Sequence, residues 1–419
     1  MKESGIDWIG QIPQGWGVKA IKYIFDEIGS GSTPKSDNEI FYDGDINWIQ
    51  SGDLYQTDTV TSVSKTISYQ GFKSTSALKI YKHPFIALAM YGASVGNVAI
   101  SCIDACVNQA VVVMLGTSET VRFGKYAIEA SKNNLIFSAQ GGTQPNISQS
   151  LIKNWNIPQP DSSEQTKIAD FLDKKTTQLD KVKSLLEEQI QKLKDYRASL
   201  IYETVTKGLD KTVSMKDSGI DWIGEVPEGW EITKHKYIMT KVKEICAHYE
   251  GQDILSLTRQ GVVVRDIESG KGKMPASFDG YQFLEKGDLL FCLFDIDVTP
   301  RCVGVVENNG LTSSAYSRFR LDDKISVYYY YYLFLSMDED KVLLHLAKNL
   351  RHSLTEDDFG IIETILPSYE EQLRIADYLG KVTKSIDEIV QLKQKQIDNI
   401  NKQRQTLIYD YVTGKRRVY

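Results

Sequence analysis

The sequence is poor in the residues and segments that mark several protein classes. It has only five cysteines among 419 residues, an odd and sparse set that excludes a disulfide framework. Cys102 and Cys106 are four residues apart, but no His/Cys pair follows at zinc-finger spacing, so we expect no metal site. The apolar stretches fall short of the roughly 18 to 20 residues that cross a bilayer, so we expect no membrane partner. Met1 to Trp8 lacks the apolar segment of a secretory signal, which predicts a cytoplasmic protein.

Basic residues and enzyme motifs are scarce as well. Lys and Arg number 49 against 55 Asp and Glu, a formal net charge of −6, whereas a basic excess is the usual footprint of a nucleic-acid-binding protein. The chain contains no P-loop, GxGxxG, HExxH or Gly-x-Ser-x-Gly motif, and no Asp/Asn-Pro-Pro-Tyr/Phe run. Neighbouring carboxylates such as Asp295 and Asp297 are more typical of solvated faces than of catalytic pairs. The sequence therefore predicts a protein that is not an enzyme by itself.

The sequence does contain an internal repeat. Residues 1–16, MKESGIDWIGQIPQGW, and residues 215–230, MKDSGIDWIGEVPEGW, share 12 of 16 positions at an offset of 214. A second block, residues 164–208, matches residues 371–415 at 18 of 45 positions with an offset of 207. The stretches between these blocks show no comparable similarity. The chain is therefore organised as constant and variable segments, each occurring twice.

The longer repeated block has the signals of a long helix. Asp161 with Glu164, and Ser368 with Glu371, stand at capping-box spacing, and Gly208 and Gly414 suit helix ends. Leucines recur every seven residues in the first copy, with Val182 and Tyr196 near the alternate seam; the leucines are Leu172, Leu179, Leu186, Leu193 and Leu200. In the second copy Lys393 interrupts the series Leu379, Ile386, Ile400 and Leu407. A dimerisation coil is one reading, but two copies in one chain favour intramolecular antiparallel pairing.

The variable stretches mix short β-like runs with turn signals, such as residues 87–91 and 110–115 in the first and 288–294 in the second. They predict compact mixed α/β domains. The aromatic run Tyr328 to Tyr332 could stack bases, but a buried element is the better reading. The predicted fold class is α+β, with two mixed α/β domains, two long helices pairing as an antiparallel coiled coil, and a pseudo-twofold repeat. The predicted ranges are 1–163 for domain 1, 164–208 for helix 1, 209–370 for domain 2 and 371–419 for helix 2.

In this order, and duplicated, the segments resemble the specificity subunits of type I restriction-modification enzymes. The residues that carry the resemblance are Ser4 to Trp16, Ser218 to Trp230, Val205 to Gly208, the Pro-x-x-x-x-Glu-Gln runs at Pro160 and Pro367, and Val412 to Lys415. Within the variable stretches, Gly31 to Pro34, Gly44 to Ile49, Asp53-Leu54 and Asn349 to Leu354 also match. The family's frequent double proline is reduced here to Pro158-Gln-Pro160 and a lone Pro367.

The resemblance implies a function and a set of partners. Two target-recognition domains would each recognise one half of a split, asymmetric target in double-stranded DNA, with the helices setting the spacing. The helices would dock two methyltransferase (M) subunits, and restriction/translocase (R) subunits would complete the assembly. No cofactor is expected on this chain, and S-adenosylmethionine is expected on the methyltransferase subunits, which would methylate a flipped-out adenine.

Side chains that match base edges or phosphates give the site candidates. Asn and Gln suit adenine, Arg and Lys suit guanine, and basic groups also contact phosphates. In domain 1 the candidates are Lys35, Gln50, Gln140, Thr143, Gln144 and Asn146. In domain 2 they are Arg259, Gln260, Arg265, Lys271, Lys273, Arg301, Arg318, Arg320, Lys348, Arg351 and His352. Solvated loop charges, or a strand-edge salt bridge at Arg318 and Arg320, are the alternatives.

The charge distribution complicates a role in DNA binding. Residues 209–370 carry a net charge of −9, whereas residues 371–419 carry +4. The basic residues of domain 2 must therefore converge on one face if the domain approaches phosphates. A coiled-coil scaffold whose variable modules bind proteins is the alternative function, and a self-sufficient nuclease or methylase is a third.

Overall fold

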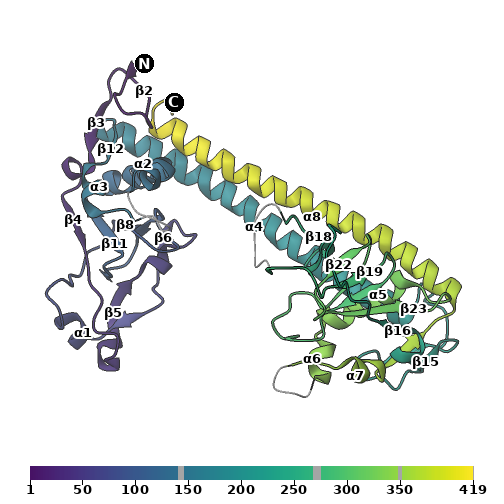
Figure 1. Ribbon diagram of the computed structural model, residues 1–419. Helices are drawn as coiled ribbons and strands as arrows, with labels where there is room; N and C mark the ends of the chain where they lie inside the picture. The colour runs from purple at the N-terminus through teal and green to yellow at the C-terminus, as the bar shows by residue number, and fades with distance from the viewer. Residues whose placement is uncertain (140–145, 268–274, 348–351, 419) are drawn as a thin grey trace. The chain divides into compact units, whose positions relative to one another are not determined.

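The computed structural model describes residues 1–139, 146–267, 275–347 and 352–418 (Figure 1). The chain forms two compact units: unit 1 comprises Met1–Leu186 and Lys395–Tyr419, and unit 2 comprises Glu187–Gln394. Two long helices, α4 (Ser162–Lys207) and α8 (Tyr369–Val412), each contribute to both units. The units thus describe packing in space, whereas the four predicted ranges describe order along the chain. The α+β prediction with two long helices is confirmed.

Unit 1 contains a mixed sheet with helices against it. Its strands are β1 (Lys2–Glu3), β2 (Gln11–Ile12), β3 (Gly17–Ala20), β4 (Glu27–Ser30), β5 (Tyr42–Ile49), β6 (Thr59–Val60), β7 (Thr66–Ile67), β8 (Phe85–Ala89), β9 (Val98–Ser101), β10 (Cys106–Val107), β11 (Val111–Leu115) and β12 (Asn156–Gln159). Its shorter helices are η1 (Ile21–Tyr23), η2 (Glu39–Phe41), η3 (Ser51–Leu54), α1 (Tyr69–Lys73), α2 (Ser118–Phe137) and α3 (Gln149–Asn154).

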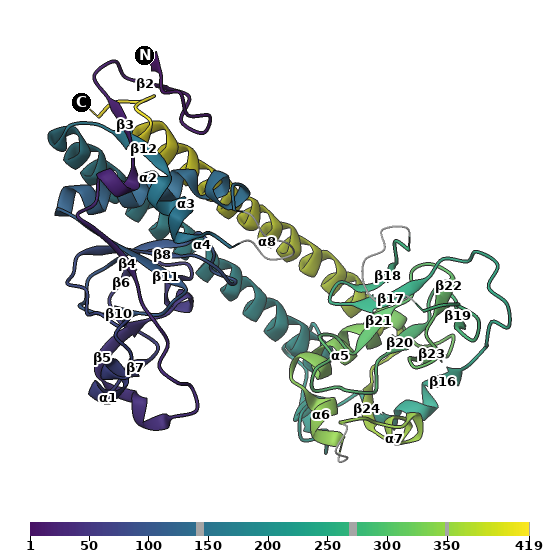
Figure 2. The same ribbon diagram turned by 60° about the vertical axis from the view of Figure 1, so that its left-hand side comes forward.

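The central sheet of unit 1 is buried on both faces. Its strand order is β4-β11-β8-β9-β6, antiparallel except for the β6–β9 pair. Because side chains alternate along a strand, Ile86 and Leu88 point into the core shared with α2, whereas Ala87 and Ala89 point into a second core. Figure 2 shows α2 and α3 on the same side of this sheet. Burial on both faces explains why β8 and β11 are continuous apolar runs rather than alternating ones.

Unit 2 is built from a similar set of elements. Its strands are β13 (Met215–Asp217), β14 (Glu225–Pro227), β15 (Glu231–Lys234), β16 (Met239–Val242), β17 (Leu255–Thr258), β18 (Gly261–Val264), β19 (Gln282–Leu284), β20 (Leu289–Phe291), β21 (Val303–Val305), β22 (Gly310–Thr312), β23 (Ser317–Leu321) and β24 (Glu363–Leu366). Its shorter helices are η4 (His235–Tyr237), α5 (Val327–Glu339), α6 (Val342–Leu346) and α7 (Glu356–Gly360).

The two variable stretches share the strand order of their central sheet, which their sequences do not reveal. The sheet β16-β23-β20-β21 of unit 2 has the strand order of β4-β11-β8-β9 in unit 1. The pairs β3–β12 and β15–β24 likewise correspond, as do η1 and η4. The structural repeat therefore extends through the variable stretches, because the same buried pattern can be filled by different apolar residues.

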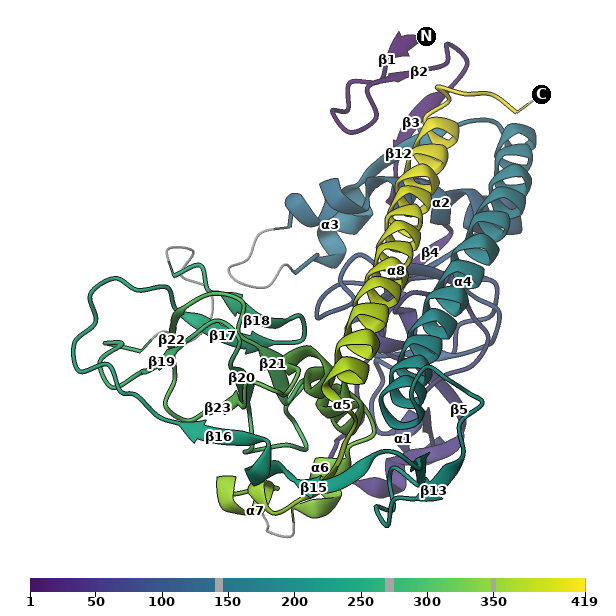
Figure 3. The same cartoon turned by 90° about the vertical axis from the view of Figure 1, so that its right-hand side faces the viewer.

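The two long helices pair antiparallel within each unit (Figure 3). In unit 1 the rings of Phe171 and Tyr411 lie 4.4 Å apart, and Arg404 Nε lies 3.5 Å from Asp180 Oδ1. In unit 2 Lys393 Nζ donates to Gln189 Oε1 at 2.6 Å, and Arg197 Nε lies 3.2 Å from Asp387 Oδ1. Residue numbers rise along one helix as they fall along the other. The predicted antiparallel pairing is confirmed, and Lys393 is accommodated by its hydrogen bond.

The alternate seam of α4, the second series of inward-facing positions beside the leucines, differs from the prediction. Val182 and Tyr196 are 47% and 56% exposed, so they lie outside the seam. The inward-facing positions seven residues apart are largely polar: Thr176, Lys183, Ile190, Arg197 and Thr204. The seam was misassigned because its members are largely polar and show no apolar period; the Thr176 hydroxyl lies 3.2 Å from that of Tyr126, and Arg197 pairs with Asp387.

The helix starts follow the predicted capping signal only in part. The amide of Glu164 donates to Asp161 Oδ1 at 2.9 Å, and that of Glu371 to Ser368 Oγ at 3.4 Å. Among the described residues, neither glutamate carboxylate accepts a hydrogen bond from the backbone amide of its cap residue, as a full capping box requires. Their carboxylates instead accept from indole N–H groups, Trp16 to Glu164 at 2.7 Å and Trp230 to Glu371 at 3.0 Å. The repeated Trp and Glu are therefore partners across each unit.

Each repeated N-terminal hairpin is held by both long helices. In unit 2 the Tyr202 hydroxyl of α4 donates to the Ile223 carbonyl at 3.1 Å, while α8 supplies Glu371 to Trp230. In unit 1 the roles exchange, since Tyr409 of α8 donates to the Ile9 carbonyl at 3.4 Å. The repeated segments thus form the joints between the helix pair and each globular part.

Glycines end both helices as predicted. Gly208 and Gly414 adopt positive φ values of 72° and 69°. The aromatic run of domain 2 also behaves as predicted, since Tyr329 and Tyr330 of α5 are fully buried. The five cysteines are free. No helix within the described ranges is long and apolar enough to cross a membrane.

Candidate nucleic-acid interface

Unit 1 presents a polar edge where several strands end. A loop after β4 is anchored there, because Trp48 Nε1 donates to the Ser32 carbonyl at 3.2 Å and the Tyr42 hydroxyl to the Pro34 carbonyl at 2.8 Å. Gly31 is required in this loop, since a Cβ there would lie 1.7 Å from the Val107 carbonyl oxygen. The exposed side chains of Thr33 and Lys35 follow.

Backbone hydrogen bonds join two predicted positions, Gln50 and Asn146, and a third residue, Gln109, along this edge. The amide of Asn108 donates to the Ile49 carbonyl at 3.0 Å, which brings Gln109 beside Gln50. The amides of Met90 and Ile147 donate to the carbonyls of Ala110 and Met90, both at 2.8 Å, which adds Asn146. We name the exposed or half-exposed group of this edge the amide edge; it consists of Thr33, Lys35, Gln50, Gln109 and Asn146.

The amide edge offers hydrogen bonds but little charge. Thr33 donates to Gln109, and the amide of Gln50 donates to Asp53 Oδ2 at 2.8 Å, so backbone and side chains hold the group in place. Gln and Asn present a paired donor and acceptor that match adenine in the major groove. Lys35 is the one candidate cation of the edge. The predicted residues Gln140, Thr143 and Gln144 lie outside the described residues.

Unit 2 presents a basic edge built on the hairpin of β17 and β18. Arg259 and Gln260 occupy its turn and are exposed. The turn is fixed by the Thr258 hydroxyl, which accepts from the Gln260 amide at 3.1 Å and donates to the Gly261 carbonyl at 3.0 Å. Gly261, with φ 103°, completes the turn. Both candidate side chains therefore project from a short, rigid hairpin.

Further candidates gather around the hairpin. Gly304 of β21 lets the hairpin pack closely, since a Cβ there would lie 2.8 Å from Val262 Cγ2. Arg301 lies just before β21 and close to the turn of the hairpin. Its Nη1 would be 3.9 Å from a Cβ atom added at Gly261. Arg265 follows β18 and is half-buried. We name Arg259, Gln260, Arg265 and Arg301 the basic edge.

His352 occupies the place in unit 2 that corresponds to the Asn146 region of unit 1. Its carbonyl accepts from the Ile296 amide at 3.1 Å, and the Leu354 amide donates to the Leu293 carbonyl at 2.8 Å, as Ile147 does to Met90. The adjoining loop exposes Val298 by 73%. Lys271, Lys273, Lys348 and Arg351 lie outside the described residues.

Arg318 and Arg320 fit the salt-bridge alternative. Arg318 is buried, with Nε 2.5 Å from Asp288 Oδ2 and Nη2 3.0 Å from Glu285 Oε1. Arg320 Nε lies 3.0 Å from Asp288 Oδ1 and Nη2 2.8 Å from Glu285 Oε2. Hydrogen bonds from Arg320 and Arg318 lower the pKa of Glu285. We therefore leave these two arginines out of the proposed interface.

Sequence reasoning missed Gln109 and Val298. Gln109 had a usable signal, because Asn108-Gln109 interrupts the apolar run of residues 106–115. Val298 had none, since a valine in a loop is ordinary until its exposure is known. An exposed apolar tip can contact the methyl group of thymine.

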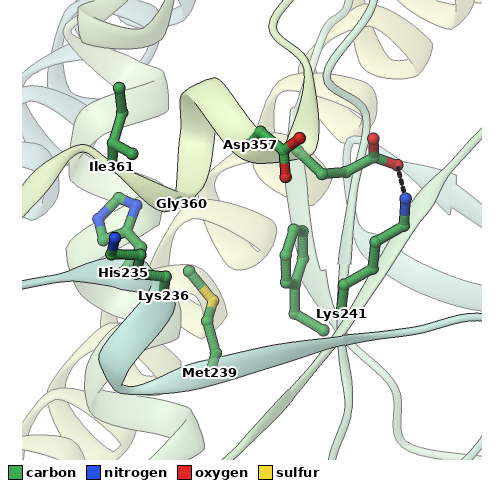
Figure 4. Close-up of a pocket in the computed structure, with 9 residues that line it drawn as sticks. His235, Lys236, Met239, Lys241, Asp357, Gly360 and Ile361 are labelled. Carbon is green, nitrogen blue, oxygen red and sulfur yellow. Dashed lines mark ion pairs between the residues drawn. The ribbon is translucent and has the colours of Figure 1, made fainter.

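A pocket of about 320 Å³ lies between η4, β16 and α7 (Figure 4). Lys241 Nζ and Glu356 Oε1 form an ion pair of 3.1 Å at its wall. Lys236 and Asp357 also line it, so the four charged groups balance, which does not favour a phosphate ligand. At the corresponding place in unit 1, Lys22 Nζ donates to Asn154 Oδ1 at 2.8 Å. Within the described ranges no cluster of three or more His, Cys, Asp or Glu could hold a metal ion.

Comparisons with known proteins agree with this architecture. A family model described as the type I restriction modification DNA specificity domain matches residues 13–194. The putative type I restriction enzyme MjaX specificity subunit of Methanocaldococcus jannaschii is 23% identical over 447 residues, covering 98% of this chain and 96% of that protein. The MjaVIII specificity subunit of the same organism is 26% identical over 326 residues, covering 70% of this chain and 69% of its own.

A solved structure shares the fold. Its description is "Structural basis underlying complex assembly and conformational transition of the type I R-M system". The TM-score is 0.71 at 14% sequence identity, with 97% of this chain and 100% of that chain covered. By these comparisons the chain is similar to the specificity subunits of type I restriction-modification systems, in a domain model over residues 13–194 and in a relative aligned over 98% of its length.

Proposed function

We propose that this chain is the DNA-recognition component of its complex, with each unit recognising one half of a split, asymmetric target. One observation carries the proposal: two units with the same central strand order display two chemically different edges. Unit 1 offers amides at Gln50, Gln109 and Asn146, whereas unit 2 offers the guanidinium groups of Arg259 and Arg301. Two chemically different edges on similarly folded units suit a target whose halves differ in sequence.

The chemistry of the edges suggests how the halves differ. Bidentate amide contacts favour adenine, and bidentate Arg contacts favour guanine, each good pair discriminating by about 1–3 kcal/mol. The amide edge therefore suits an adenine-containing half, and the basic edge a guanine-containing half. The long helices, continuous through both units, would set the number of unread base pairs between the halves.

The proposed partners are two copies of one methyltransferase subunit. Support comes from a duplicated apolar pair on the helices: Val182 and Leu185 on α4 are 47% and 48% exposed, and Ile389 and Leu392 on α8 are 43% and 59% exposed. The two pairs are related by the repeat offset of 207 residues. Exposed apolar side chains at matching positions suit the same partner surface twice. Restriction/translocase subunits would complete the assembly, which we place in the cytoplasm.

Catalysis would reside in the partners. S-adenosylmethionine bound by the methyltransferase subunits would supply the methyl group, and the adenine would be flipped out of the helix to reach it. This chain would supply the recognition of the target sequence, because its two edges offer hydrogen-bonding and charged groups on exposed loops.

Mapping methylated adenines tests the proposal. The chain would be expressed with its methyltransferase subunits in a methylation-deficient host, and the genome sequenced by a single-molecule method. We expect one split motif that disappears when this chain is omitted. Methylation that persists without the chain, or a chain that methylates DNA alone, would contradict the assignment.

The alternative function is a scaffold whose variable modules bind proteins. It predicts that the assembled complex binds bulk DNA without sequence preference or not at all. Competition between the mapped motif and a scrambled duplex at one salt concentration separates the two functions.

A further inference from the structure

Each unit contains a largely buried arginine whose side chain extends from a long helix to the globular part of the unit. The two arginines, Arg197 and Arg404, are related by the repeat offset of 207, as are their aspartate partners Asp180 and Asp387. Each arginine lies on one helix and its aspartate on the other. Each also meets a glutamate of a domain helix, Glu129 in the middle of α2 in unit 1 and Glu339 at the end of α5 in unit 2.

In unit 1 this cluster has five charges. Arg404, only 15% exposed, pairs with Glu129, with Asp58 at 2.5 Å and with Asp180 at 3.5 Å. Lys125, 2% exposed, bridges the same Asp58 and Glu129 at 2.8 Å each. Burial alone would raise the pKa of Asp58, but Lys125 and Arg404 hold it below its ordinary value. We name this group clasp 1.

Clasp 1 ties a long helix to the sheet as well as to α2. Asp58 precedes β6, and its carbonyl accepts from the Ile100 amide of β9 at 3.0 Å. Arg404 therefore connects α8 to the edge of the central sheet. The domain cannot slide along the helix by one residue, about 1.5 Å, without breaking several short ion pairs.

Clasp 2, in unit 2, is smaller. Arg197, 17% exposed, lies 3.2 Å from Asp387 and 3.6 Å from Glu339. Burial raises the pKa of Glu339, and Arg197 and Arg301 act against it. Its contacts are longer and it contains no buried lysine among the described residues, so clasp 2 should hold its domain less firmly than clasp 1.

We propose that Arg404 and Arg197 are positioning residues that make the gap between the two half-sites strict. The proposal rests on the function proposed above. Apolar packing between domain and helix tolerates small shifts, whereas a buried group of alternating charges is satisfied in one geometry, a role in specificity rather than in stability. A loosened clasp would let a domain reach half-sites displaced by one base pair.

A library of gap lengths tests this proposal in the assembled methyltransferase. Plasmids would carry both half-sites at the native gap and at gaps one or two base pairs shorter or longer, and methylation would be quantified in cells. We expect Arg404→Gln to raise methylation at neighbouring gaps, relative to the native gap, at least tenfold over wild type, and Arg197→Gln to raise it less. Lys381→Gln removes an exposed charge of α8 whose partner, Asp377, lies 2.6 Å away on the same helix, and should change nothing.

A second variant distinguishes a change in domain placement from a folding defect. Asp58→Asn keeps the shape of clasp 1 while removing one charge, and we expect it to broaden the accepted gaps as Arg404→Gln does. Strict native-gap methylation in both variants would overturn the proposal. Loss of all methylation in both would also overturn it, because the cluster would then be needed for folding rather than placement. A wild-type methyltransferase complex that methylates no split site would contradict the proposed function, and the clasp proposal would fall with it.

Discussion

Residue-level differences between the units are clearest where unit 2 buries a titratable group. His235 replaces Ile21 at the repeat-equivalent position and is fully buried between the rings of Phe334 and Phe359. Its Nδ1 lies 3.0 Å from the Phe359 carbonyl, while Nε2 is buried and has no hydrogen-bond partner among the described residues. Burial lowers the pKa of His235 to about 4. The imidazole is therefore neutral in the folded protein at neutral pH.

This histidine should make unit 2 acid-sensitive. The pKa is lower in the folded than in the unfolded chain, so stability is present above about pH 6.5 and is lost as the pH falls toward 4, by up to about 3 kcal/mol. We expect His235→Ile, which copies unit 1, to flatten this dependence in urea titrations at pH 7 and pH 5. His248→Gln, at an exposed histidine, is the control. An unchanged pH dependence in His235→Ile would contradict the account.

Arg259 should contribute directly to DNA affinity. It is exposed at a rigid turn, so Arg259→Ala should weaken binding of the assembled complex to its target by about 1–3 kcal/mol. Arg320→Ala should cost less, because Arg320 is already paired with Asp288 and Glu285. Fluorescence anisotropy at one salt concentration measures both. Equal or reversed effects would remove Arg259 from the interface.

Residue types alone could not separate these two arginines. Asp288, the partner of Arg318 and Arg320, is some 30 residues away, and only the pairing of β20 with β23 brings it close. Gln50 and Asn146 were predicted by their chemistry, but their common edge depends on backbone contacts between distant strands. Candidate side chains could thus be named from the sequence, whereas their proximity could not.

At the level of elements, the ends of the helices are tightly constrained. Gly414 has φ 69°, and a Cβ there would lie 2.4 Å from Pro13 Cδ. Gly414→Ala should therefore destabilise unit 1 by about 2–4 kcal/mol, from backbone strain and overpacking together. Gly251, with φ 93° and open space around its Cα, is the control and should cost about 1–2 kcal/mol on change to Ala. Urea titrations compare the two; equal costs would show that contact with the hairpin is unimportant.

The exposed apolar pairs on the helices should each bind one partner. Leu185→Asp and Leu392→Asp should each reduce the complex from two methyltransferase copies to one, because each places a carboxylate in one apolar patch. Native mass spectrometry counts the copies. Ser184→Asp adds the same charge on another face of α4 and should leave two copies. Retention of both copies in the two leucine variants would contradict the docking proposal.

The helices were predictable because their signals are local: caps, glycine ends and a seven-residue leucine series. The shared topology of the variable stretches was not, because strands such as β8 and β20 fill equivalent places with different residues. The alternate seam was misassigned because its polar members, Arg197 among them, pair with carboxylates far away in sequence.

On the scale of the whole molecule, duplication of the sequence accounts for the repeated architecture. One hairpin, one domain topology and one long helix each occur twice, and each hairpin is bound by both helices. Divergence runs through both variable stretches, and the two edges differ in chemistry, amide in unit 1 and basic in unit 2. Under the proposed function, such an arrangement would let one half of a target change without disturbing the other. The acidic balance of residues 209–370 suits a subunit that shares its contacts with phosphates among partners.

The most direct test changes one edge at a time and maps the methylated motif again. Arg259→Ala with Gln260→Ala should relax one half of the split motif and leave the other intact, and Gln109→Ala with Asn146→Ala should do the reverse. A motif that changes in both halves with either pair, or in neither half with both pairs, would contradict the assignment of one half-site to each unit.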